Sequence, residues 1–245
     1  MKFSVITVCY NSEKTIRDNV ESVGCQNQCS YEHIIIDGGS VDNTLKIINK
    51  FSNPNIIIKS ERDNGIYDAM NKGVKLADGD VVCFLNSDDI YPTTNVLSQV
   101  QAAFEKFDGE FAWGNISLCD DLWVENRYWR TTSISYKQPK HFRQLPHPGV
   151  FVRREKLLKL GIPFDCRYRL AADLDQQLRM IYLHSFRGIH IDSCLVKMRL
   201  GGASTRNITS HFDGFKESTL IYNNHFTSGG SIFSIRKILQ KLKQK

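Results

Sequence analysis

The sequence lacks any run of about 18 or more apolar residues, the length that a membrane-spanning helix requires. Its first residues lead directly into a strand-like segment rather than into the apolar core of a signal peptide. Both absences argue against a secreted or membrane-spanning chain. We therefore expect a cytoplasmic protein.

Several ligand-binding signatures are also missing. The seven cysteines are scattered and never spaced as Cys-x-x-Cys, so neither a disulfide framework nor a zinc site is indicated. The sequence contains neither the Gly-x-Gly-x-x-Gly pattern of dinucleotide-binding folds nor the Walker phosphate-binding pattern. Ordinary dinucleotide or P-loop phosphate binding is therefore disfavoured.

The composition is that of a globular protein: 245 residues, 41% hydrophobic and 24% charged, with a formal net charge of +6. Much of the positive excess lies in the last ten residues. We predict one domain over residues 1–226, followed by a linker and a basic tail over residues 227–245.

Apolar strands and amphipathic helices alternate near the N-terminus. Strand-like runs at residues 3–9, 33–36, 56–58 and 81–85 are separated by segments with apolar residues at helical spacing. This alternation predicts an α/β fold with a mostly parallel sheet flanked by helices. The second half of the chain is more irregular and rich in aromatic residues, and we expect it to extend the sheet.

Polar clusters occupy the strand ends, where parallel sheets gather their ligands. Residues 10–11, 37–40 and 86–89 should therefore converge on one crevice. Asp37 precedes two glycines, so the backbone could approach a ligand while the carboxylate accepts hydrogen bonds from a ribose or a base. A turn aspartate that caps the next helix is the alternative.

In the segment "FLNSDDI" an apolar strand is followed directly by oxygen-bearing side chains. Asn86, Asp88 and Asp89 supply hard donors that suit Mg²⁺ or Mn²⁺ bound in part by a substrate diphosphate. The same residues also suit a turn in which Ser87 or Asp88 caps the backbone and Asp89 is solvated.

Four segments together resemble the donor half of glycosyltransferase family 2: "VITVCYN" (5–11), "IIIDGGSVDNT" (34–44), "SERDNGIYDAMNKG" (60–73) and "FLNSDD" (84–89). The resemblance implies a GT-A fold, a Rossmann-like sheet that binds a nucleotide sugar, with UDP-sugars favoured. It divides the domain into a nucleotide-sugar half, residues 1–110, and an acceptor half, residues 111–226.

The resemblance also implies a Mn²⁺ or Mg²⁺ ion, held by an Asp-x-Asp motif against the donor diphosphate. Asn86-Ser87-Asp88 matches that motif with Asn in first position, so Asp88 becomes the expected metal ligand and Asp89 its helper. The positions implied in nucleotide-sugar binding are Thr7, Tyr10, Asn11, Asp37, Asp68, Asn71, Asn86 and Ser87.

Within this set, Asp37 is the expected partner of uracil or another base. Asn71 belongs to an Ala-x-Asn-x-Gly helix motif, although Met70 stands where many members have Arg. The variant "GIYDAMNKG" resembles the subgroup that builds bacterial exopolysaccharide and lipopolysaccharide repeat units, including colanic-acid-type enzymes. Asp68 within it either faces the ligand or lies on the helix surface.

The expected catalytic base lies in the second half. "RLAADLDQQLRM" (169–180) resembles the family segment in which an acidic residue precedes a helix near the acceptor, and Asp173 is the matching position. An apolar stripe from Leu174 to Ile181 places Asp173 near the helix start, where the helix dipole favours a carboxylate. Asp175 is the second candidate, and a purely capping role for Asp173 is the alternative.

Three further residues have open roles. His147 could contact donor or acceptor, or could be structural between its two prolines. Arg206 and His211 follow a Gly-Gly-x-Ser segment that suits either a lid over the diphosphate or an ordinary surface loop. The absence of a Gln-x-x-Arg-Trp motif argues against a processive polysaccharide synthase.

The C-terminal tail has the pattern of an interfacial helix. Ile235, Ile238, Leu239 and Leu242 fall on one helical face, and basic residues occupy the others. Residues 231–245 could therefore contact an anionic membrane surface, or could pack as an ordinary amphipathic helix. Nucleic-acid binding is not expected, because no stacking aromatics are interleaved with the basic residues.

Together these features predict a metal-dependent, inverting, non-processive glycosyltransferase in bacterial surface polysaccharide synthesis. Its acceptor would be a glycan carried on a polyprenyl diphosphate. The enzyme would work at the inner face of the membrane. A sugar nucleotidyltransferase and a catalytically inactive nucleotide-sugar-binding module are the alternatives.

Overall fold

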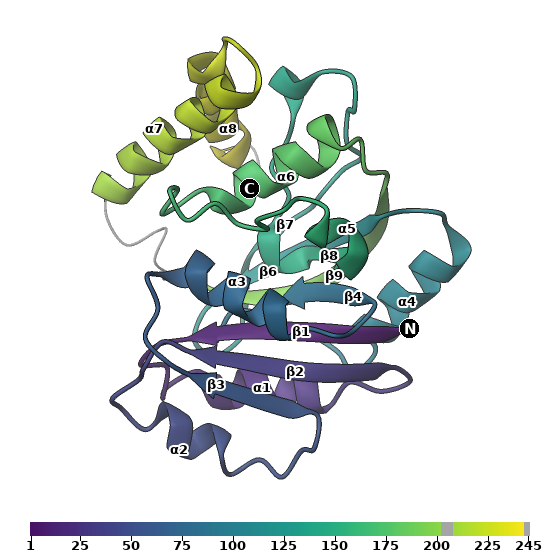
Figure 1. The fold of residues 1–245 in the computed structure, drawn as a ribbon, viewed down its shortest axis with the longest axis vertical. Helices are drawn as coiled ribbons and strands as arrows, with labels where there is room; N and C mark the ends of the chain where they lie inside the picture. The colour runs from purple at the N-terminus through teal and green to yellow at the C-terminus, as the bar shows by residue number, and fades with distance from the viewer. Residues whose placement is uncertain (202–207, 243–245) are drawn as a thin grey trace.

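The computed structural model describes residues 1–201 and 208–242. Within these residues, nine strands form one curled sheet with helices on both sides (Figure 1). The first half of the sheet contains four parallel strands in the order β3 (Ile56–Ser60), β2 (Ser30–Asp37), β1 (Lys2–Cys9) and β4 (Val81–Phe84). The predicted α/β fold is confirmed.

The second half continues the same sheet, as predicted, but with strands of mixed direction. β8 (Val150–Arg153) runs antiparallel to β4, and β6 (Phe111–Cys119) lies between β8 and β9 (Gly188–Arg199). β7 (Glu125–Trp129) pairs with β6 and the short β5 (Asp89–Ile90) pairs with β9, both antiparallel. The parallel pattern weakens here because β6 and β7 are joined by a turn that reverses the chain rather than by a crossover helix.

Helices cover both faces of the first half. α1 (Ile16–Gly24) and α2 (Thr44–Ile48) pack with Ile35 on one face, whereas α3 (Ile66–Leu76) packs with Ile34 on the other. Neighbouring residues of β2 are therefore buried on opposite faces. This double burial explains why the strand sequence is continuously apolar.

The remaining secondary structure surrounds the second half of the sheet. It consists of α4 (Val96–Lys106), the 3₁₀ turns Pro139–His141 and His147–Gly149, α5 (Arg154–Leu158), α6 (Ala172–Leu178) and the π turn Arg179–Leu183. α6 confirms the helix that the sequence predicts from about residue 171, and the π turn extends it.

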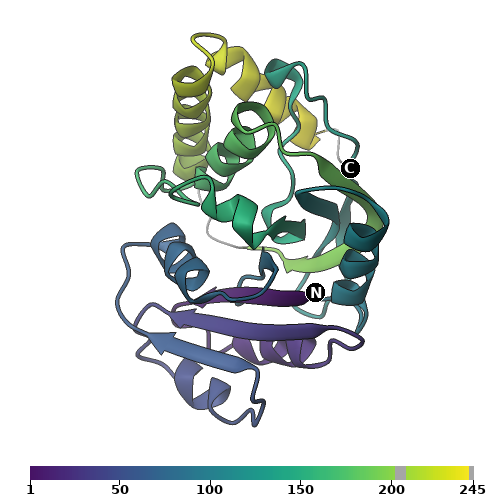
Figure 2. The ribbon, with the colours of Figure 1, turned by 45° about the vertical axis from the view of Figure 1, so that its right-hand side comes forward.

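Two helices end the chain as a hairpin, drawn in yellow-green and yellow in Figure 2. α8 (Gly230–Leu242) packs against α7 (Ile208–His225), with the ring of Phe233 stacked on that of Tyr222 at 4.7 Å between centroids. The basic tail is thus helical, as predicted. In the part of the chain that the structure describes, no helix combines the length and the apolarity needed to cross a bilayer.

Candidate active site

A cleft of about 610 Å³ opens at the carboxyl ends of β1 and β4. The start of α3, the segment at residues 144–148 and the first turn of α6 form its other walls. Its polar lining consists of Tyr10, Ser12, Asp63, Tyr67, Asn86, Ser87, Asp88, Gln144, His147, Arg169, Asp173 and Lys237. Two of the three predicted clusters therefore meet in one crevice, whereas residues 37–40 lie outside its lining.

Five of the predicted site residues line the cleft: Tyr10, Asn86, Ser87, Asp88 and Asp173. Tyr10 is 61% exposed, so its ring is available to a ligand at the surface. The hydroxyl of Ser87 is 2.9 Å from that of Ser12, which joins the loops after β4 and β1. These loops form the sheet side of the cleft.

Asp37 has no exposed surface, and its carboxylate accepts several hydrogen bonds from neighbouring residues. The backbone N–H groups of Gly39 and Ser40 lie 3.1–3.2 Å from its oxygens, and the hydroxyl of Ser60 donates at 2.6 Å. The hydroxyl of Ser40 also donates to it. In this structure Asp37 holds its own turn, whereas Asp42 and not Asp37 accepts the N–H of Thr44 at the start of the next helix, α2.

Thr7, Asn11, Asp68 and Asn71 also lie outside the cleft lining, and each has partners within the protein. The hydroxyl of Thr7 contacts Nε2 of His33 at 2.9 Å, and Oδ1 of Asn11 accepts the N–H of Val41.

On α3, Asp68 accepts the N–H of Asn64 and pairs with Lys72, and these contacts lower its pKa although partial burial opposes the shift. Asn71 exchanges two hydrogen bonds with the backbone of Phe164, at 2.7 and 3.0 Å. These residues fix the frame around the cleft.

The donor set at the end of β4 fits a divalent cation only with help from a substrate. Asp88 lines the cleft, and Oδ1 of Asn86 is buried without a hydrogen-bond partner among the described residues. No group of three or more His, Cys, Asp and Glu side chains within the described ranges could hold a metal. Hard oxygens of a diphosphate and water would have to complete the coordination.

Asp89 sits behind Asp88 and does not line the cleft. Its side chain is 1% exposed, and Oδ2 accepts a hydrogen bond from Asn86 at 3.2 Å. Burial, reinforced by the charge of Asp88, raises its pKa well above the ordinary value. Asp88 is therefore the carboxylate that this segment presents to the cleft.

Asp173 lies in the first turn of α6, as predicted, and lines the cleft. Its Oδ1 accepts a hydrogen bond from the hydroxyl of Tyr67 at 3.2 Å, and its Oδ2 accepts one from Nε2 of Gln144 at 2.7 Å. Burial and the Asp173 charge raise the pKa of Tyr67 well above the usual value, which keeps the phenol protonated as a donor. The carboxylate is thus oriented by two neutral groups.

The alternative base, Asp175, is already paired. It is buried, with its carboxylate 2.7 Å from Nε of Arg179 and 2.7 Å from Nε2 of His225. The structure therefore favours Asp173 over Asp175 as the cleft carboxylate.

The loop that leads into α6 is anchored by Glu217, whose carboxylate accepts three backbone N–H groups from residues 169–171.

His147 lines the cleft between two aromatic rings. Its ring lies 5.1 Å from that of Phe84 and 5.5 Å from that of Phe164, and both ring nitrogens are buried without partners in the described residues. Burial lowers its pKa, although the charge of Asp173 opposes the shift. A neutral imidazole with an unused donor and an unused acceptor can hydrogen-bond a ligand hydroxyl.

Some cleft residues were not identified by sequence reasoning. Tyr67 stands in the quoted "GIYDAMNKG" motif and Gln144 precedes "LPHPG", yet their contact with Asp173 joins segments distant in sequence. Lys237 reaches the cleft from α8 and donates to the hydroxyl of Ser218 at 3.0 Å. Arg206 and the side chain of His211, whose roles the sequence left open, lie outside the described residues.

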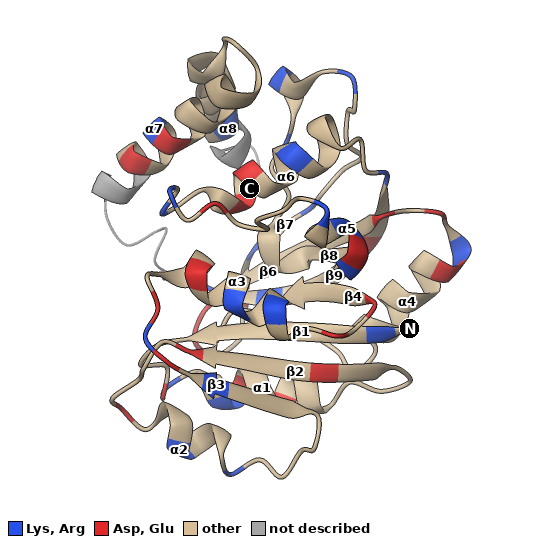
Figure 3. Cartoon of the chain, in the orientation of Figure 1, with Lys and Arg blue, Asp and Glu red and all other residues tan. Residues whose placement is uncertain are grey.

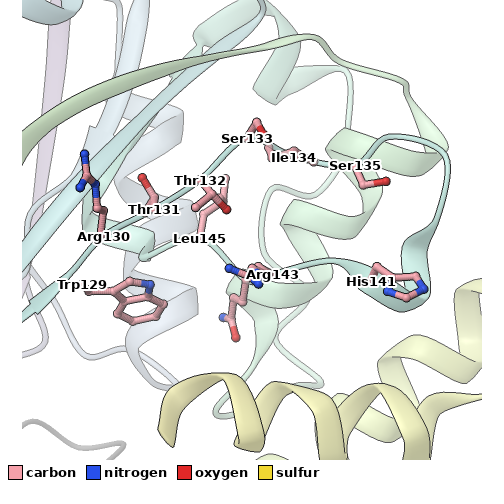
Figure 4. Close-up of a pocket in the computed structure, with 11 residues that line it drawn as sticks. Trp129, Arg130, Thr131, Thr132, Ser133, Ile134, Ser135, His141, Arg143 and Leu145 are labelled. Carbon is pink, nitrogen blue, oxygen red and sulfur yellow. The ribbon is translucent and has the colours of Figure 1, made fainter. Parts of the chain in front are cut away.

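A second pocket, of about 480 Å³, adjoins the cleft (Figure 4). It is lined by residues 129–135, His141, Arg143, Gln144 and Leu145. Trp129, Gln144 and Leu145 line both spaces, so the two pockets share a wall. We refer to this second space as the basic pocket.

Comparison with known families now identifies the domain. The model of Glycosyl transferase family 2 matches residues 4–167, which include the sheet side of the cleft, the shared wall and His147. The chain belongs to glycosyltransferase family 2. This finding confirms the family and the enzyme class that the sequence motifs predict.

Curated relatives of this family 2 chain include glycosyltransferases from two bacterial groups. A PGL/p-HBAD biosynthesis glycosyltransferase of Mycobacterium bovis is 32% identical over 181 residues, covering 72% of this chain and 68% of the relative. UDP-Glc:alpha-D-GlcNAc-diphosphoundecaprenol beta-1,3-glucosyltransferase WfaP of Escherichia coli is 30% identical over 162 residues, covering 66% of this chain and 64% of WfaP.

Solved structures share the fold of this family 2 chain. S. aureus TarS 1-349 in complex with UDP-GlcNAc superposes with a TM-score of 0.70 at 22% identity, covering 100% of this chain and 72% of TarS. Mannosyltransferase PcManGT from Pyrobaculum calidifontis, in complex with GDP-Man and Mn²⁺, gives 0.69 at 14% identity, covering 97% and 69% of the two chains. These likenesses support the GT-A fold.

Proposed function

We propose that this chain transfers a sugar from a nucleotide sugar to a glycan hydroxyl, without processivity and with inversion at the anomeric carbon. The observation that carries the proposal is that Asp88, after β4, and Asp173, on α6, line one cleft. One carboxylate lies where a donor diphosphate is expected, and the other lies where an acceptor hydroxyl can approach. Membership of glycosyltransferase family 2 supports this division of roles.

Asp173 acts as the general base in this proposal. Its carboxylate takes the proton of the acceptor hydroxyl while that oxygen forms a bond to the anomeric carbon and the bond to the diphosphate oxygen breaks. Attack from the face opposite the leaving group inverts the configuration. Tyr67 and Gln144 hold the carboxylate in place through the hydrogen bonds at 3.2 and 2.7 Å.

Asp88 is the proposed ligand for Mn²⁺ or Mg²⁺, with Asn86 beside it and Asp89 as a support behind. When bound, such an ion would neutralise the charge that develops on the departing diphosphate. The hard oxygen donors of this segment suit both ions. Asp89 contributes by orienting Asn86, whose amide donates to it at 3.2 Å.

The nucleotide is proposed to lie against the loops after β1 and β4, with Tyr10 beside it and Ser87 near the diphosphate. UDP-sugars are favoured because WfaP is named for UDP-Glc and the TarS structure contains UDP-GlcNAc. Thr7, Asn11, Asp68 and Asn71 would act by holding the frame around the cleft. Contact between Asp37 and the base of the nucleotide remains a prediction. It would require the Asp37 carboxylate to exchange some of its present hydrogen bonds for bonds to the ligand.

The acceptor is proposed to be a glycan carried on a polyprenyl diphosphate at the inner face of a bacterial membrane. The name of WfaP specifies such an acceptor. Helix α8 supports the location, because Ile232, Ile235, Ile238 and Leu239 expose 47–60% of their surface. A role in surface polysaccharide assembly, including a colanic-acid-type pathway, is proposed from the "GIYDAMNKG" motif at residues 65–73.

Thermal unfolding with nucleoside diphosphates tests the donor site. UDP together with Mn²⁺ should raise the melting temperature, and UDP without a metal should raise it less, because binding to the folded state alone stabilises it. GDP and ADP serve as competitors for specificity. If none of the three nucleotides changes the melting temperature with or without metal, the proposed donor site is wrong.

A further inference from the structure

The basic pocket lies beside the catalytic cleft and has an unusual charge distribution. Between residues 126 and 154 the chain contains seven Lys and Arg residues and no Asp or Glu. Figure 3 marks basic residues in blue along this part of the ribbon. Two of these seven residues, Arg130 and Arg143, line the pocket, and the lining that the structure describes contains no Asp or Glu, so the pocket is suited to an anionic ligand.

Arg143 is the cation of the pocket without an ion pair among the described residues. Arg130, at the other side, pairs with Asp192 at 2.8 Å, so its charge is already compensated. The side chains of Thr132 and Ser133 are exposed and form no hydrogen bond with the described protein groups, whereas Thr131 is bonded to Asn115 and His190. Figure 4 shows Arg143 and the hydroxyl-bearing segment at residues 131–133 around the same space.

Of the three residues that line both spaces, Gln144 connects the pocket to the reaction centre. Gln144 lines both spaces, and its Nε2 donates to Asp173 at 2.7 Å. A ligand that fills the basic pocket therefore places its next chemical group beside Asp173. That group would be the acceptor sugar.

The pocket is also connected to the exposed apolar stripe of α8. Nη1 of Arg236 on this helix contacts the carbonyl oxygen of Lys140 at 3.4 Å and Nδ1 of His141 at 3.5 Å. His141 lines the pocket, and Ile235 on the same helix is 50% exposed. From Asp173 outward, the order is thus a sugar site, a cationic pocket and an apolar surface.

We propose that the basic pocket binds the diphosphate of a sugar-diphosphate-lipid acceptor, with Arg143, Thr132 and Ser133 as its contacts. This assignment rests on the proposed function. Arg143 supplies a bidentate donor for phosphate oxygens, and the two hydroxyls supply neutral donors. The lipid chain leaves along α8, which explains why a basic helix with exposed Ile and Leu side chains lies beside a polar pocket.

Binding of undecyl diphosphate, measured by calorimetry in saturating UDP and Mn²⁺, tests the pocket. Saturating UDP prevents the probe from occupying the donor site. Wild-type protein should bind the probe, and Arg143→Gln should weaken binding by about tenfold or more, since a hydrogen bond to a charged group is lost. Arg17→Gln is the matched control, because the side chain of Arg17 on α1 is exposed. This variant should bind the probe as the wild type does.

Two further probes separate the sources of the diphosphate. Inorganic pyrophosphate should bind more weakly than undecyl diphosphate, and equal binding of the two would overturn the lipid-linked assignment. Undecyl glucoside, which has no phosphate, should bind weakly and without regard to Arg143. Undiminished binding of undecyl diphosphate by Arg143→Gln would overturn the pocket assignment.

The melting shift caused by UDP and Mn²⁺ distinguishes this inference from the proposed function. In one outcome, UDP stabilises Arg143→Gln as much as the wild type while undecyl diphosphate binds both proteins equally. In that case the pocket assignment alone is wrong. If UDP stabilises neither protein, the donor site itself is wrong.

Discussion

The loops around Asp37 and the cleft wall around His147 differ in whether their buried polar atoms have hydrogen-bond partners. The Asp37 carboxylate accepts hydrogen bonds from Gly39, Ser40 and Ser60. Both nitrogens of His147, by contrast, are buried with no partner in the described residues. The first region satisfies the polar atoms of Asp37 within the fold, and the second leaves two ring nitrogens of a residue that lines the cleft without a partner in the described part of the protein.

The difference separates residues that build the site from residues that can act in it. A buried polar atom without a partner costs about 1–3 kcal/mol, so its persistence beside a cleft is consistent with a partner supplied by a ligand. The satisfied groups near Asp37 carry no such cost. Substitutions in the two regions should therefore affect different measurements.

Asp173→Asn should have the largest effect, because it removes the proposed base while keeping the shape of the side chain. We expect transfer to slow by about a thousandfold, within the range for general acid–base catalysis. Steady-state transfer assays with a UDP-sugar, together with the melting shift caused by UDP, measure the effect. Asp121→Asn, at a carboxylate whose side chain is 87% exposed, is the control. An Asp173→Asn enzyme as fast as the control would remove Asp173 from the mechanism.

Acid should destabilise the Asp37 side of the molecule through His33, which is buried and bonded to Thr7. Burial lowers the pKa of His33 to about 3, from 6.5 in an exposed chain. The unfolded state therefore binds a proton that the folded state does not, and stability falls as the pH drops from 6.5 towards 3. At pH 4 the loss is about 3 kcal/mol.

Urea unfolding of the wild type and of His33→Gln at pH 7 and pH 4 isolates this contribution. The variant should lose less stability than the wild type between the two pH values. An equal loss in both proteins would show that other groups cause the acid sensitivity.

Asp37→Asn should reduce the free energy of unfolding by about 2 kcal/mol, because an amide donor replaces one of the acceptor oxygens facing Ser40 and Ser60. Urea unfolding measures the change, and UDP calorimetry measures the donor site in the same protein. Normal stability together with lost UDP binding would give Asp37 a direct ligand role, as expected of His147, and not a structural one.

His147→Phe should lower activity much less than Asp173→Asn does, and it should have none of the cost in stability. Phenylalanine keeps the packing against Phe84 and Phe164 while removing two unpartnered nitrogens. We expect kcat/KM for transfer to fall about tenfold, the worth of one hydrogen bond, with an unchanged or higher melting temperature. A fully active variant would make His147 a packing residue only.

Sequence patterns predicted the first half of the fold because its signals are local. Apolar strands, helical spacing and polar strand ends lie within short windows, and the β1, β2 and β4 predictions follow from them. The antiparallel pairings of β6, β7 and β8 depend on contacts between distant segments. No local pattern specifies those contacts.

The site was predictable to a similar extent. Asp88 and Asp173 were identified from motif and helix position, and the structure places both in one cleft. The arrangement of their neighbours was not predictable, since Gln144 and Tyr67 reach Asp173 only through the tertiary fold. The same limit hid the contribution of Lys237 from the C-terminal helix to the cleft.

The configuration of the transferred sugar tests the central claim most directly. Wild-type protein, an α-linked UDP-sugar, Mn²⁺ and a diphosphate-linked acceptor sugar should give a product whose new bond has the β configuration, read from the anomeric proton coupling by NMR. A β-linked product is the result expected of a single displacement assisted by Asp173. An α-linked product would contradict the mechanism.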